Sequence, residues 1–137
     1  MLMSETAQSV EVSYQKFGID FAEAAMRHME WRERLKNHIS GTAMDSWPSS
    51  EATQYDRCEL GRWLRTIGRA QLGHLSAFRH LELAHAEFHY FAGVILSKAM
   101  LKEVVQAEEI LKNEFSQATR RVLVSINEIN ALPSLQR

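Results

Sequence analysis

The chain of 137 residues has the length of one compact domain, and its 45% hydrophobic and 24% charged residues are typical of a globular protein rather than a disordered or fibrous one. A net charge of −1 without a long basic run gives no electrostatic attraction to nucleic acid or to an anionic membrane. The single cysteine excludes an internal disulfide, and no apolar stretch is long enough to span a bilayer, so we expect a cytoplasmic protein.

The N-terminal part predicts one long amphipathic helix. Residues 1–17 lack the basic and apolar segments of a signal peptide. Residues at alternating intervals of three and four then share one face of a helix. That face consists of Tyr14, Phe17, Phe21, Ala24, His28, Trp31, Leu35 and His38. The following segment 40–50 combines glycine, proline, serine and aspartate, which predicts a linker.

A shorter helix is predicted between Cys58 and Ile67. Asp56 fits its N-cap, because Glu59 follows three residues later as in a capping box. Gly68 is positioned to end the helix. Cys58 would then lie in the first turn, where unpaired amides and the helix dipole favour a thiolate.

Two further long helices follow the same spacing, with a turn predicted near residues 97–101. Their faces consist of Leu75, Phe78, Glu82, His85, His89, Ala92, Leu96 and Ala99, and of Glu108, Leu111, Phe115, Ala118, Val122, Ser125, Ile129 and Leu132. Amphipathic helices bury their apolar faces against one another. We therefore expect an all-α, antiparallel four-helix bundle with one short helix, forming one domain over residues 1–137 with its core at about 10–131.

Histidines occupy core positions where a bundle normally has aliphatic side chains. His28 lies on the first face, and His85 and His89 lie one turn apart on another. Several buried imidazoles are costly unless something binds them. Zn²⁺ takes nitrogen and thiolate ligands in a tetrahedron, and Cys58 can supply the fourth ligand. We predict one zinc ion held between the helices by these four residues, although the ligand types do not exclude copper.

Other titratable residues receive different interpretations. Glu82 either orients His85 through a hydrogen bond or is a solvated carboxylate. A di-iron enzyme would need a second Glu-x-x-His motif besides Glu82-x-x-His85, and the sequence has none at a matching place, so we expect no enzyme activity. We interpret three further histidines as hydrogen-bonded residues rather than ligands: His38, His74 and His80.

Three motifs together resemble the chemoreceptor zinc-binding domain, a bacterial cytoplasmic regulatory family. They are the His-x-x-Trp pattern in residues 27–31, the C-x-L-G-x-W element in residues 58–64 with a glycine at 68, and the H-x-x-x-H pair in residues 85–89. The resemblance covers roughly residues 10–131. It implies the same four ligands, His28, Cys58, His85 and His89, and core positions for Trp31 and Trp63.

The resemblance also implies a function. Family members are similar to zinc-holding four-helix bundles that regulate chemoreceptors or diguanylate cyclases, respond to zinc or to thiolate oxidation by hypochlorous acid, and commonly form homodimers. No output domain accompanies these 137 residues, so the chain is either a free-standing member acting on a signalling partner in trans or an excised piece. A purely structural zinc module for protein interaction is the alternative. Val122, Val124 and Ile126 predict either a wide core face or a dimer surface.

Overall fold

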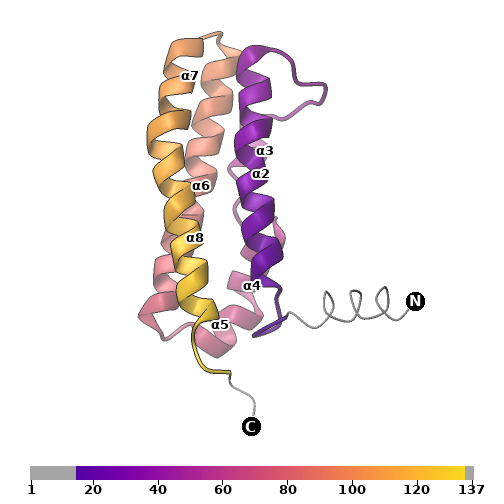
Figure 1. Ribbon diagram of the computed structural model, residues 1–137. Coiled ribbons are helices and arrows are strands. Elements are labelled where there is room, and N and C mark those ends of the chain that lie inside the picture. The colour runs from indigo at the N-terminus through magenta and orange to yellow at the C-terminus, as the bar shows by residue number, and fades with distance from the viewer. Residues whose placement is uncertain (1–14, 135–137) are drawn as a thin grey trace, which may run out of the picture.

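The computed structural model describes residues 15–134, and within them the chain forms helices and no strand (Figure 1). The predicted all-α helical bundle is confirmed. None of these described helices combines the length and the apolar character that crossing a bilayer requires. The elements are α2 (Phe21–Ser40), α3 (Ser49–Ala52), α4 (Glu59–Arg65), α5 (Ile67–Leu72), α6 (Ser76–Met100), α7 (Val104–Ile110), the π-helix η1 (Leu111–Phe115) and α8 (Ser116–Asn130).

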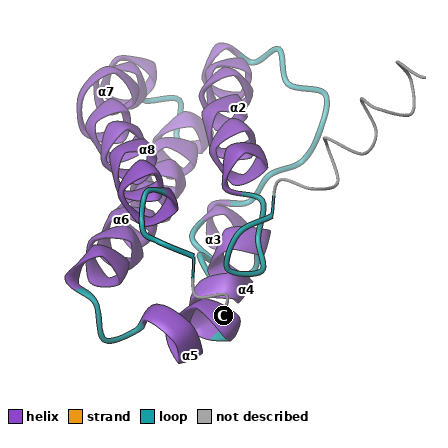
Figure 2. Ribbon diagram, turned by 60° about the horizontal axis from the view of Figure 1, so that its bottom comes forward, coloured by secondary structure: helices purple, strands orange, loops and turns teal. Residues whose placement is uncertain are grey.

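Three long rods make up most of the bundle. In Figure 1, α2 and α6 run upward, and the continuous rod of α7, η1 and α8 runs back down, packing along both. The connection from α2 to α6 descends behind α2 in the view of Figure 1 and contains the three short helices α3, α4 and α5 (Figures 1 and 2). These short helices take the place of a fourth rod, and α3 packs closely against α6.

The first long helix begins later than its apolar spacing predicts. Asp20 is the N-cap of α2, and its side chain accepts a hydrogen bond of 3.0 Å from the backbone N–H of Glu23. Phe17 belongs to a tight turn before this cap, and Tyr14 lies outside the described residues. The prediction from apolar spacing began the helix too early, because Phe17 in the preceding turn happens to fit the same spacing.

The short helix α4 is capped differently from the prediction. Its N-cap is Cys58, with extended backbone angles, and Asp56 lies outside the helix in an ion pair with Arg65. Gly68 does not end α4, whose last residue is Arg65 and whose C-cap is Thr66, but lies inside α5. A Cβ at Gly68 would lie 2.8 Å from the Trp63 ring, so this glycine gives space for an aromatic side chain.

The C-terminal rod contains a feature that heptad spacing cannot reveal. Its π-turn, η1, inserts an extra residue into one turn, and the Ser116 hydroxyl donates a 2.9 Å hydrogen bond to the Leu111 carbonyl there. The preceding turn lies after Met100, slightly beyond the predicted position.

The core confirms most of the predicted packing positions. Trp63, Phe78 and Phe88 are buried, and Trp31 is partly buried against them. Val122 and Ile126 are also buried, whereas Val124 is 59% exposed. Of the last helix's apolar excess, therefore, two residues are core, and only Val124 faces outward.

Candidate metal centre

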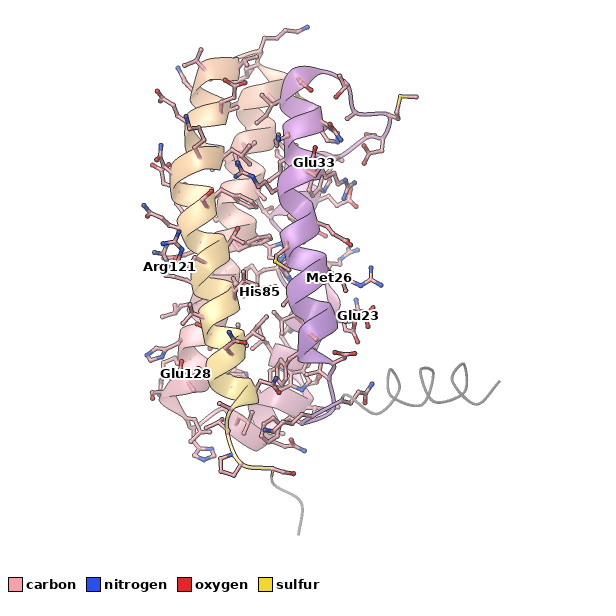
Figure 3. The ribbon with its side chains drawn as sticks, in the orientation of Figure 1. Glu23, Met26, Glu33, His85, Arg121 and Glu128 are labelled. Carbon is pink, nitrogen blue, oxygen red and sulfur yellow. The ribbon has the colours of Figure 1, made fainter. Side chains whose placement is uncertain are left out.

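The three predicted histidines and the cysteine meet at one place inside the bundle. His28 comes from α2, Cys58 from the N-cap of α4, and His85 and His89 from consecutive turns of α6. One nitrogen or sulfur atom from each lies within 4.8 Å of all the others. Figure 3 labels His85, whose side chain is fully buried between the rods. Within residues 15–134 no other group of three or more such donors gathers.

The distances between the donor atoms suit one tetrahedral zinc ion. The Sγ atom of Cys58 lies 3.1 Å from Nε2 of His85 and 3.8 Å from Nε2 of both His28 and His89. The Nε2 atoms of His85 and His89 are 3.1 Å apart. Zinc bonds of about 2.05 Å to nitrogen and about 2.3 Å to sulfur put neighbouring ligands of a tetrahedron roughly 3.3–3.6 Å apart. The four atoms therefore surround a space of the right size.

Backbone carbonyls fix the orientation of two imidazole rings. Nδ1 of His28 donates to the Ala24 carbonyl at 2.8 Å, and Nδ1 of His89 donates to the Ala52 carbonyl at 2.9 Å. Because a carbonyl can only accept, each Nδ1 carries the proton and each Nε2 presents its lone pair to the centre. Such hydrogen bonds are usual for metal-bound histidines. The buried Nδ1 of His85 has no partner among the described residues.

Aromatic rings separate the imidazoles from water. The ring of Phe88 lies 4.9 Å from that of His28 and 5.4 Å from that of His89. The ring of Trp31 lies 4.7 Å from that of His89. An apolar wall of this kind strengthens the electrostatic attraction between a cation and its ligands.

Burial keeps the three imidazoles uncharged at neutral pH. Desolvation is the largest cause for each, because it disfavours the charged ring. It lowers the pKa of His89 to about 4, lowers the pKa of His28, and together with the neighbouring His89 and His28 lowers the pKa of His85 well below its usual value. Neutral imidazoles have the lone pair that metal binding requires.

Cys58 is held by the start of its own helix. The backbone N–H of Gly61 donates to Sγ at 3.3 Å, as expected for a side chain at an N-cap. This contact lowers the thiol pKa, but burial outweighs it, and the net effect raises the pKa of Cys58. The helix terminus therefore favours the thiolate as expected, but burial has the larger effect on the thiol. A bound cation would be needed to displace the proton.

The donor set fits a closed zinc site better than a catalytic one. At least two Nε2 lone pairs and the sulfur face one another in a space lined by aromatic rings, and a cation relieves that repulsion. Three imidazoles and one thiolate complete a tetrahedron and leave no position for water or substrate. The arrangement is suited to structural or sensory binding.

The remaining titratable residues lie elsewhere. Glu82 pairs with Arg69 on the surface, so the solvated interpretation holds and the carboxylate does not orient His85. None of the other histidines joins the cluster: His38 pairs with Asp45 at 3.1 Å, His80 pairs with Glu128 at 3.4 Å, and His74 is exposed.

Two positions that support the centre were missed by sequence reasoning. The Ala52 carbonyl in α3 reaches His89 only because α3 packs against α6 at Gly93. A Cβ at Gly93 would lie 2.2 Å from Cγ2 of Thr53. A glycine in the middle of a long helix, one turn after a predicted ligand, was the available signal for this close approach.

Gly93→Ala should lower zinc affinity about tenfold without changing a ligand. The new methyl group displaces Thr53 and the end of α3, so His89 loses the carbonyl that orients its ring, and loss of such a partner typically costs about 10–100-fold. Alanine otherwise favours a helix over glycine by about 1 kcal/mol, so weaker binding would not reflect helix propensity. Competition with a chromophoric chelator measures the affinity.

The control for this variant is a compensating substitution. Thr53→Ser removes Cγ2, which leaves the Ser49 carbonyl, at 3.3 Å, as the nearest atom to the new methyl group. The double variant should recover most of the lost affinity. If Gly93→Ala binds zinc like the wild type, or if Thr53→Ser restores nothing, the packing of α3 against α6 does not position His89.

Comparison with known proteins agrees with this geometry. Residues 28–96, just over half of the chain, match the family model described as the chemoreceptor zinc-binding domain. The matched span begins at His28 and contains Cys58, His85 and His89. Searches of curated proteins and of solved structures found no match.

Proposed function

The chain belongs to the chemoreceptor zinc-binding domain family, and we propose that it is a regulatory domain that binds one Zn²⁺ through His28, Cys58, His85 and His89. The observation that carries this proposal is the convergence of three imidazole nitrogens and one sulfur within 4.8 Å, from three separate helices. Such a site couples zinc occupancy to helix packing, because the ion joins α2, α4 and α6 directly.

Zinc occupancy can act as a signal because it changes the stability of one arrangement of these helices. An ion that binds only the packed state stabilises it by mass action. Without the ion, α4 is no longer joined to α2 and α6 through metal–ligand bonds, and a looser arrangement of the helices becomes accessible. We propose that the chain is a single cytoplasmic domain that forms a homodimer. A signalling partner of the chemoreceptor or diguanylate cyclase type would respond to the difference between its zinc-bound and zinc-free packing.

Metal analysis of the purified protein tests the proposal. We expect about one zinc per chain, and a pull-down from cell extract should recover a signalling protein whose amount changes when zinc is chelated. A protein with two irons and no zinc would contradict the zinc assignment. Zinc that is present while the pull-down is independent of chelator would support a purely structural module instead.

A second function, oxidant sensing at the same site, is supported by the position of Cys58. The three histidines are buried, whereas Cys58 is only partly buried. Hypochlorous acid would oxidise the thiolate to sulfenic acid and release chloride, which removes a strong zinc ligand. The ion and the N-terminus of α4 would then be released together.

Hypochlorous acid should therefore release zinc from the wild type but much less from Cys58→Ser, provided that this variant still binds zinc. The measurement is the absorbance of a zinc indicator during stepwise addition of oxidant. His74→Ser is a suitable control, because it alters an exposed residue outside the cluster and should leave the release unchanged. Equal release from wild type and Cys58→Ser would rule out oxidant sensing through Cys58.

A further inference from the structure

A tight turn at the start of the described chain is hydrogen-bonded to the helix that Cys58 caps. Lys16 and Ile19 exchange two backbone hydrogen bonds, of 2.9 and 3.2 Å, around Phe17 and Gly18. The indole N–H of Trp63, in α4, donates to the Phe17 carbonyl at 2.7 Å. The turn is therefore attached to the same seven-residue helix that begins at the metal centre.

The turn is strained and needs this attachment. Phe17 has φ 55° and Gly18 has φ 85°, so both central residues are left-handed. Glycine adopts that conformation freely, whereas a residue with a large side chain does so at a cost in free energy. Conformations of this kind persist when surrounding contacts enforce them, and they are common in switch regions.

The same turn also binds the other end of the chain. The Lys16 ammonium group donates to the carbonyls of Asn130 and Leu132, and the first of these hydrogen bonds is 2.7 Å long. These carbonyls lie at and just beyond the end of α8, where a positive charge is favourable. Figure 1 shows the beginning of α2 and the end of α8 at the same end of the bundle, beside α4 and α5.

Trp63 is placed to transmit a movement of α4. Its ring is buried, packs edge-on against Phe21 of α2 at 5.3 Å, and lies over Gly68 of α5. The indole N–H therefore has one fixed direction, toward the Phe17 carbonyl. Because α4 is short, a shift at Cys58 moves the whole helix rather than bending it.

We propose that the turn of residues 16–19 is a zinc-dependent latch, closed when Cys58 is bound to the ion and opened through Trp63 when it is not. The latch joins the N-terminal turn to the end of α8, so its opening changes how the two ends of the domain are held together. This inference rests on the proposed zinc binding. It identifies how a change in zinc occupancy at the metal centre affects the two ends of the domain.

Hydrogen exchange of the zinc-loaded and chelated protein tests the latch. We expect removal of zinc to accelerate exchange of the Lys16 and Ile19 amides at least tenfold, and by more than at Val122 in the middle of α8. Trp63→Phe keeps a buried ring but removes the N–H, so these amides should exchange fast even with zinc bound. By linkage, this variant should also lower zinc affinity, about tenfold.

Two controls separate the latch from general destabilisation. Trp47→Phe makes the same change at a buried tryptophan in the linker before α3, packed against Trp31 and His38 of α2 rather than against the turn, and should leave the Lys16 and Ile19 amides unaffected. Lys16→Met removes the contacts of the ammonium group with the end of α8 and with the Phe17 ring, and should accelerate exchange in the turn of a fully folded protein.

The outcomes distinguish the latch from zinc binding itself. If the protein binds one zinc and the two amides exchange equally with and without it, there is no latch, and the proposed function stands. If Trp63→Phe preserves the zinc-dependent difference, the route through the indole is wrong. If the protein binds no zinc, the proposed function fails first.

Discussion

His85→Leu is expected to abolish the stabilisation of the protein by zinc while leaving the zinc-free fold at least as stable as the wild type. His85 is fully buried, and its Nδ1 atom has no hydrogen-bond partner among the described residues. Without metal, that atom costs free energy, and leucine removes the cost while filling a similar space. With metal, the variant has lost one of the four proposed ligands.

The size of the effect follows from the linkage between binding and folding. A ligand at about 1,000 times its dissociation constant stabilises the folded state by roughly 4 kcal/mol, which is on the order of 10 °C in melting temperature for a domain of this size. Loss of a residue that only orients a ligand costs about 10–100-fold in affinity, so loss of the ligand itself should cost more than about 100-fold. Thermal unfolding with zinc and with chelator measures both quantities.

His80→Leu is the matched control. His80 lies on the same helix, is exposed, and pairs with Glu128 at the surface. Its replacement should leave the zinc-dependent rise in melting temperature unchanged. A His85→Leu protein that zinc stabilises as much as the wild type would show that these four residues do not hold the ion.

The gathering of His28, Cys58, His85 and His89 could be predicted from sequence, because the pattern that singles out the histidines is local. His85 and His89 lie one turn apart, and a histidine on an otherwise apolar helical face is costly to bury unless it binds a partner. Their convergence with His28 required only that the amphipathic faces pack together. The bundle followed from the same faces, and the structure confirms it.

The details of the connection between α2 and α6 could not be predicted, because they depend on tertiary contacts. Asp56 satisfies every local rule for an N-cap, but the chain places Cys58 there, with its sulfur accepting the Gly61 N–H. Gly68 is the residue type that commonly ends a helix, but here its missing side chain leaves space for the Trp63 ring. In both cases, long-range packing overrides a local preference.

The pKa of Cys58 likewise depends on the folded structure and could not be predicted from sequence alone. A helix N-terminus lowers a thiol pKa through its amides, and sequence reveals that effect. Burial raises the pKa, and only the folded structure shows how deeply the sulfur is enclosed. Because burial prevails here, the zinc-free protein should hold Cys58 as a thiol at neutral pH, which reserves the thiolate for the metal-bound state.

Gly61→Ala should disrupt the centre more than any other change outside the ligands. A Cβ at this position would lie 1.9 Å from the Tyr55 carbonyl oxygen and 2.9 Å from its carbon. Both atoms belong to the backbone, so no side-chain rotation relieves the overlap. The turn before Cys58 must move, and the Gly61 N–H then no longer holds Sγ in place.

We expect this variant to lose about 10–100-fold in zinc affinity, as when a residue that orients a ligand is removed, and about 2–3 kcal/mol of stability from overpacking. Gly41→Ala is the control. Gly41 ends α2 with φ 82° and nothing lies within 4 Å of its missing Cβ, so alanine there costs about 1–2 kcal/mol in backbone strain alone. The control should lose stability but keep its zinc affinity. If Gly61→Ala behaves in the same way, the glycine serves only the fold, and the position of the sulfur does not depend on the turn that precedes it.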